Sequence, residues 1–296
     1  MPKGVSAPVF KSFKTFVLLA GLSGLLLAAG QMIGGRSGLT TALAFAMILN
    51  VGTYWFSDKL AIKMARAVPA DPGSHPWYHH MVAELSAQAG QPVPALYISP
   101  SPQPNAFATG RNPAHAAVCV NQGLIDLLDH DEMEGVLAHE LSHVHNRDIL
   151  IGTIAATIAT AITFMARIGF FFGGGGRDRD GGGILMLFLA PVAAMLIQFA
   201  VTRSRETQAD TSGATLSGKP LALASALQKL ETGGRVLARR GVGGTPAETS
   251  SAFSSLYISA PFGGLGRAGA LFRTHPTTEA RVANLQQIAR QMGQIA

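Results

Sequence analysis

Long apolar windows alternate with polar stretches along the chain and define its organisation. None of these windows contains a charged residue. A helix that spans a bilayer needs about 20 mostly apolar residues, so each window predicts a transmembrane helix. One such window could be a buried helix of a soluble protein, but four of them favour a membrane protein. The windows are Phe16–Ile33, Leu39–Phe56, Ile149–Ala166 and Ile184–Val201.

The first window has a second interpretation, as a cleaved signal peptide. Lys11 and Lys14 precede it, and the small residues 28–30 would suit cleavage. The run is long for a signal peptide, however, and another apolar window follows at once. A membrane span is therefore the preferred interpretation.

Basic residues flank the first pair of windows and predict the orientation of the chain. They precede the first window and follow the second, whereas only Arg36 lies between them. The positive-inside rule then places the N-terminus and residue 57 onward in the cytoplasm. The Gly-rich stretch 173–183 joins the last two windows as a flexible linker, so both polar segments face one compartment. The flanking basic residues are Lys3, Lys11, Lys14, Lys59, Lys63 and Arg66.

The polar segments predict one α+β domain that is split by a membrane hairpin. We divide the chain into an N-terminal tail and transmembrane hairpin (1–56), a first domain part (57–148), a second hairpin (149–201) and a second domain part (202–296). Short apolar runs between prolines predict a small antiparallel sheet of Ala95–Ser99, Asn105–Thr109 and Ala116–Val120. The stretch 233–269 is rich in Gly, Ser, Ala and Arg and predicts a long loop.

Residues 139–143 read His-Glu-Leu-Ser-His and carry the predicted chemistry. A D-x-x-E cap pattern at Asp131 and Glu134, followed by apolar residues at helical spacing, predicts a helix over 131–146. On a helix, His139 and His143 share one face and can bind one Zn²⁺, while Glu140 is free to act as general base. The sequence thus predicts a zinc hydrolase with one zinc ion per chain.

Zinc needs a third protein ligand, and four residues are candidates: His145, Glu206, Asp210 and His275. His145 points away from the proposed metal on the helix. His143 lies about 9 Å before the third window and Glu206 about 7.5 Å after the fourth, so both stand at a similar height on an antiparallel pair. Asp210, one turn beyond Glu206, could accept the second N–H of a ligand histidine. Alternatively, Glu206 and Asp210 belong to a solvated charged face.

Composition narrows the class further. Charged residues make up 14% of the chain, against about 25% in typical soluble domains. The net charge of +6 comes largely from residues that flank the windows, so it indicates orientation in an anionic membrane and no nucleic-acid partner. Cys119 is the only cysteine, which excludes an internal disulfide and a cysteine-based zinc site.

Four sequence elements resemble the HtpX family of bacterial inner-membrane zinc metalloproteases, which is related to type-1 CAAX prenyl proteases. The resemblance covers nearly the whole chain, in order and in the layout of four spans. The elements are 139–143 with the following Asn146-Arg147-Asp148, 204–210, 104–110 and 274–281.

The resemblance implies a gluzincin-type fold in the inner membrane, an active site toward the cytoplasm, and a role in quality control of damaged membrane proteins under stress. It supports Glu206 as the third ligand and makes His275 a candidate oxyanion donor, although a structural role before Pro276 is equally open. The strand Asn105, Ala106, Phe107, Ala108 and Thr109 could be an open edge that pairs with an extended substrate, or a plain core strand.

Expected partners are unfolded membrane proteins and the lipid bilayer, with self-cleavage as a further expectation. Two other functions stay open: a membrane-bound zinc hydrolase of non-peptide substrates, and a non-catalytic membrane scaffold or transporter. The uncharged spans argue against transport.

Overall fold

The computed structural model describes residues 35–172, 181–239 and 276–295, together with residues 17, 20–21 and 23–26. The chain divides into two compact units. The first comprises Met1–Thr53 and Ile151–Ser204, and the second comprises Tyr54–Leu150 and Arg205–Ala296.

The larger parts of three long apolar helices form most of the described part of the first unit, and the remainder of each belongs to the second unit. Helix α2 (Gly35–Met64) contains the second predicted window, α6 (Asp148–Phe172) the third, and α7 (Gly181–Ser217) the fourth. Among the described residues, the segment Asp148–Ala166, with a mean hydropathy of 2.0, is long and apolar enough to cross a membrane. The first window lies mostly outside the described residues, but its described positions are helical.

Small residues line the contact between α6 and α7 in this unit. Ala155 and Ala159 of α6 are buried in one cluster with Ala190 and Ala194 of α7. Small side chains let helices approach closely, and van der Waals packing of this kind holds helices together where the surroundings are themselves apolar.

The second unit contains a mixed four-stranded sheet, so the predicted purely antiparallel sheet was wrong. The strand order is β1-β2-β4-β3, with β2 parallel to β4 and the other two pairs antiparallel. The chain from β2 passes over β4 to form β3 on its far side, and alternation of apolar residues does not encode strand direction. The strands are β1 (Val68–Pro69), β2 (Ala95–Ser99), β3 (Ala106–Thr109) and β4 (Ala117–Asn121).

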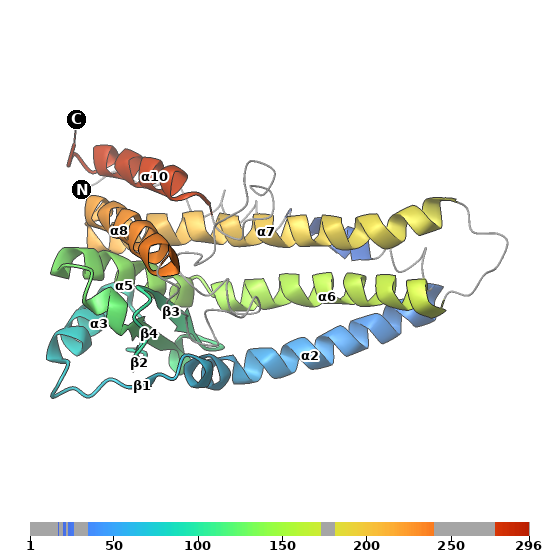
Figure 1. The fold of residues 1–296 in the computed structure, drawn as a ribbon, viewed down its shortest axis with the longest axis horizontal. Coiled ribbons are helices and arrows are strands. Elements are labelled where there is room, and N and C mark those ends of the chain that lie inside the picture. The colour runs from blue at the N-terminus through green and yellow to red at the C-terminus, as the bar shows by residue number, and fades with distance from the viewer. Residues whose placement is uncertain are drawn as a thin grey trace. The chain divides into compact units, whose positions relative to one another are not determined.

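Helix α5 (His130–His145) is the central helix of the second unit (Figure 1). It begins with a capping box in which Asp129 and Glu132 bond each other's backbone N–H groups, two residues before the predicted pair. Asp131 and Glu134 both bind the Lys219 ammonium instead, at 2.6 Å each. Apolar side chains of α5 enter a core that also includes Tyr78 and Leu223.

Three further helices pack in this unit, and a short one, α4 (Gln122–Ile125), follows β4. Helices α3 (Pro76–Ala89) and α8 (Pro220–Arg239) pack against α5, and α10 (Thr278–Gln291) packs against α8. The helix α8 continues to Arg239, so the predicted loop over 233–269 was wrong for its first seven residues; the remainder lies outside the described residues.

Candidate active site

Helix α5 presents two imidazoles from one face at consecutive turns. His139 and His143 are four residues apart, and their Nε2 atoms lie 3.1 Å from each other. His139 is fully buried, whereas the side chain of His143 is 17% exposed. One side of the pair is therefore closed by protein, and the other remains within reach of solvent and substrate.

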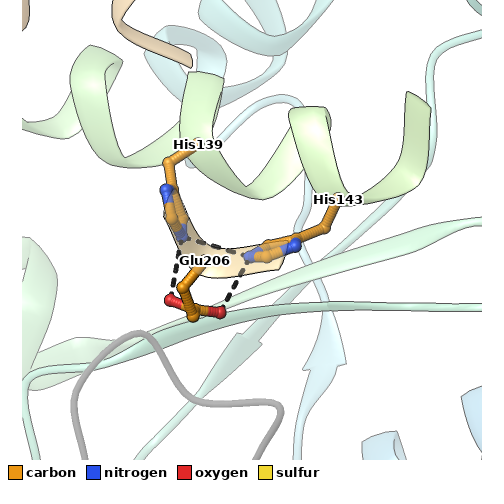
Figure 2. A group of neighbouring side chains, drawn as sticks. All are labelled: His139, His143 and Glu206. Atoms are coloured by element: carbon orange, nitrogen blue, oxygen red, sulfur yellow. Dashed lines mark hydrogen bonds and ion pairs between the residues drawn. The ribbon is translucent and has the colours of Figure 1, made fainter. Parts of the chain in front are cut away.

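Glu206 of α7 completes a three-residue cluster with these histidines (Figure 2). Its Oε1 lies 3.3 Å from His143 Nε2, and its Oε2 lies 3.7 Å from His139 Nε2. Tetrahedral zinc with bonds of about 2.0–2.1 Å separates its ligand atoms by about 3.3–3.4 Å. Two imidazole nitrogens and a carboxylate at these spacings fit one zinc ion and leave a fourth position for water or substrate.

Asp210, one turn beyond Glu206, lies behind His139. Its Oδ1 is 3.0 Å from His139 Nδ1, as expected for a carboxylate that orients a ligand histidine. Arg281 of α10 holds the same carboxylate through Nε at 2.9 Å and Nη2 at 2.6 Å. Burial alone would raise the pKa of Asp210, but Arg281 and His139 lower it, so the carboxylate stays ionised.

The guanidinium of Arg281 also reaches the proposed metal ligands. Its Nη1 lies 3.4 Å from Glu206 Oε2, and its Nη2 lies 3.4 Å from His139 Nε2. Arg281 is buried with 4% of its side chain exposed; burial would lower its pKa, but the carboxylates of Asp210 and Glu206 outweigh it and raise this pKa above its usual value. A permanent positive charge therefore lies beside the cluster.

Asp148, the first residue of α6, lies behind His143. Its Oδ2 is 2.7 Å from His143 Nδ1, and its Oδ1 accepts hydrogen bonds from Arg205. Burial would lower the pKa of His143, but the bonds to Asp148 and Glu206 outweigh it and raise this pKa well above its usual value. Both histidines thus have a carboxylate at Nδ1, which leaves Nε2 for the metal.

Glu140 follows His139 on α5 and is almost fully buried, with 2% of the residue exposed. Its carboxylate accepts a hydrogen bond from the backbone N–H of Ala108 on β3. Burial raises the pKa of Glu140 and the two histidines oppose the rise, with a net upward shift. A carboxylate with a raised pKa beside a metal cluster is suited to take up and release a proton near neutral pH.

Strand β3 is an edge of the sheet, and its hydrogen-bonding pattern shows which groups face outward. Asn121 N–H donates to Asn105 C=O at 2.9 Å. Hydrogen-bonded and non-hydrogen-bonded pairs alternate in an antiparallel ladder, so the backbone N–H and C=O groups of Phe107 and Thr109 point toward β4. The backbone N–H groups of Ala106 and Ala108 then point away from β4. The Asn105 side chain accepts from the first, at 2.9 Å, and Glu140 accepts from the second.

Gly213 lets α7 approach α5 directly at the metal ligand. A Cβ at this position would lie 2.7 Å from both the Cα and the backbone N of His139. No side chain fits there without a shift of the backbone. Gly213 lies on the same helix as Glu206 and Asp210, so its absence of a side chain places both carboxylates against the histidines.

The structure brings together most residues singled out from the sequence and adds others. His145 is exposed, as expected for a residue that points away from the cluster, and Cys119 is a buried thiol. His275 lies outside the described residues. Sequence reasoning missed Asp148, Arg205, Arg281 and Gly213. Asp148 had a visible signal, because it is an acid at the start of an otherwise uncharged span.

Residues 72–289 match the sequence model of Peptidase family M48, and this range includes all the described site residues named above. The chain belongs to peptidase family M48. Within that family it is 48% identical over 288 residues to a protease HtpX homolog of Ralstonia pickettii, covering 95% of this chain and 98% of the relative. A protease HtpX homolog of Persephonella marina is 46% identical over 291 residues, covering 96% and 99%. The resemblance to the HtpX family is thus confirmed.

The crystal structure of S. mikatae Ste24p has a similar fold. The superposition has a TM-score of 0.56 at 17% sequence identity and covers 94% of this chain and 66% of Ste24p. At this identity the likeness concerns the fold alone. It agrees with the mainly helical architecture.

Proposed function

We propose that this M48 family member is a membrane-embedded zinc endopeptidase that cleaves misfolded or damaged membrane proteins. The observation that carries the proposal is the cluster of His139, His143 and Glu206 with the buried carboxylate of Glu140 on the adjacent helix position. Three ligands of this kind, a general base and an open fourth position are what peptide hydrolysis by activated water requires.

The proposed chemistry divides among the residues of the site. When bound, zinc lowers the pKa of its water to about 7 and polarises the scissile carbonyl. Glu140 takes the proton from the attacking water and passes it to the leaving amine. Arg281 supplies a fixed positive charge beside the developing negative charge. We assign His275 the role of a further oxyanion donor from its place in the family element.

The edge of β3 is our proposed substrate-binding strand. Main-chain hydrogen bonds are the same for every sequence, so strand addition gives affinity without sequence selection. The outward-facing backbone groups of Ala106 and Ala108 lie on the strand next to Glu140, which would place the scissile bond beside the base. Asn105 and Phe107 complete this strand segment.

For the membrane, we propose four transmembrane helices in the bacterial inner membrane, with both halves of the peptidase domain toward the cytoplasm. The segment Asp148–Ala166 supports this, as do the helical second and fourth windows. A reporter that is active only outside the cytoplasm should give signal when fused at Gly35 and none at Asp71. Signal at Asp71 would overturn the orientation.

A role in protein quality control and stress response, one zinc per chain, and self-cleavage belong to the same proposal. The competing function is a zinc hydrolase of non-peptide substrates, which would use the same ligands. The test is purified protein in detergent, given an unfolded membrane protein and a panel of esters and amides. Cleavage of the protein that a zinc chelator stops, and that zinc restores, supports the endopeptidase. Hydrolysis of the small substrates alone would favour the competitor.

A further inference from the structure

A second buried ion pair stands behind the proposed metal site, on the side of His143. Arg205 of α7 donates from Nε and Nη2 to Oδ1 of Asp148, whose Oδ2 lies 2.7 Å from His143 Nδ1. Both side chains of the ion pair are 7% exposed. Arg205 also donates to Gln208 Oε1 at 2.8 Å and to the C=O of Asn146, the last cap residue of α5, at 3.4 Å.

Each histidine is thus backed by a carboxylate and an arginine. The first set of contacts runs from His139 to Asp210 to Arg281, and the second from His143 to Asp148 to Arg205. In each set the carboxylate lies at Nδ1 of the histidine. A carboxylate at Nδ1 fixes the tautomer and the ring orientation of a ligand histidine. A buried carboxylate in turn needs a fixed positive partner, because burying an unpaired charge is costly.

The Asp148–Arg205 ion pair also connects helices α5, α6 and α7. Arg205 directly precedes the ligand Glu206, and the two side chains point in different directions because successive residues turn by about 100° on a helix. Arg205 can thus hold α7 against the end of α5 and the start of α6 while Glu206 faces the histidines.

We propose that Asp148 and Arg205 are positioning residues for zinc: their ion pair orients His143 and fixes α7 at the height where Glu206 reaches the same metal ion. The inference rests on the proposed zinc site. Neither residue touches the substrate in this scheme, and Arg205 acts on His143 only through Asp148.

The test compares zinc affinity across single and double variants of the full-length protein in detergent. Zinc affinity is measured by competition with a chelator of known affinity. Asp148→Asn and Arg205→Met should each weaken zinc binding roughly 10–100-fold, as losses of partners behind metal ligands do. Arg205→Lys, which keeps the charge but loses the two-pronged contact, should lose less.

The double variant tests whether Arg205 acts on His143 through Asp148. Because Arg205 works through Asp148, Asp148→Asn combined with Arg205→Met should bind zinc no more weakly than the worse single variant. Substitution with Co²⁺ gives a second readout, because misorientation of His143 changes the ligand-field absorption of the bound cobalt. A changed spectrum is expected for Asp148→Asn.

A control separates positioning from simple stability. Glu132→Gln alters another buried carboxylate of α5 that binds a lysine, Lys229, at 2.6 Å. This variant should unfold more readily without any change in zinc affinity or cobalt spectrum. Thermal unfolding in excess chelator reports the stability of each metal-free variant.

Wild-type zinc affinity and cobalt spectrum in folded Asp148→Asn would overturn the inference, as would fully additive losses in the double variant. A variant that fails to fold is replaced by Arg205→Lys, whose unchanged zinc affinity would also contradict it. Failure of the wild-type protein to bind zinc would instead overturn the proposed function, so the two failures are distinguishable.

Discussion

Gly213→Ala is expected to separate α7 from α5 and to damage the metal site. The added Cβ would lie 2.7 Å from two backbone atoms of His139, and carbon atoms pack best at about 3.5–4.0 Å. Backbone cannot rotate away as a side chain can, so α7 has to move by about 1 Å. Functional sites tolerate displacements of about 0.5 Å, and a misplacement of 1 Å can cost about 10²-fold in activity.

The expected effect on stability is smaller than the effect on activity. Overpacking costs about 1–3 kcal/mol, and alanine regains about 1 kcal/mol over glycine in a helix. The matched control is Gly234→Ala on α8, where an added Cβ meets nothing within 4 Å. This control should be at least as stable as the wild type and should keep its zinc.

Chelator competition, proteolysis of an unfolded substrate and thermal unfolding measure the three quantities. We expect Gly213→Ala to fold but to lose about 10²-fold in turnover, with weaker zinc binding. Wild-type zinc affinity and turnover in Gly213→Ala would show that the spacing of α5 and α7 at the metal site does not depend on this contact.

Four further variants test separate parts of the structure. Glu206→Ala should lower zinc occupancy and activity together, and Asp210→Ala should weaken zinc binding roughly 10–100-fold; full zinc content by metal analysis in Glu206→Ala would place the third ligand elsewhere. Glu132→Ala should lower the free energy of unfolding by about 2 kcal/mol, because its carboxylate no longer accepts from the Asp129 N–H of the capping box or binds Lys229; an unchanged denaturation midpoint would contradict this. Ala108→Pro removes an N–H that faces away from β4 and donates to Glu140, so it should reduce turnover of unfolded substrates at normal zinc content. An equal loss with a short single-bond peptide would place the effect at Glu140, and wild-type turnover of unfolded substrates would refute the edge-strand proposal.

Much of the site could be predicted from the sequence because its signals are local. The spacing of four residues puts His139 and His143 on one helix face without any knowledge of the fold. Glu206 and Asp210 could be placed because the distance of each residue from the end of its apolar window gives its position along the helix relative to His143. The strand Ala95–Ser99 has the predicted bounds, since prolines stand at 94 and 100.

The features that escaped prediction depend on long-range packing. The parallel pairing of β2 with β4 follows from where β3 docks, and the strand sequences do not encode it. Two overlapping D-x-x-E patterns compete for the start of α5, and Lys219, far along the chain, binds the one that does not cap it. Likewise, the role of Arg281 is visible only once α10 is placed beside α8.

The most direct test of the proposed zinc endopeptidase is Glu140→Gln, with zinc content and peptide cleavage measured on the same purified sample. We expect this variant to retain one zinc per chain and to lose about 10²–10⁴-fold in cleavage, because Glu140 moves protons and does not hold the metal. Normal cleavage by the Gln variant, or a wild-type protein that binds no zinc at His139, His143 and Glu206, would contradict this proposal.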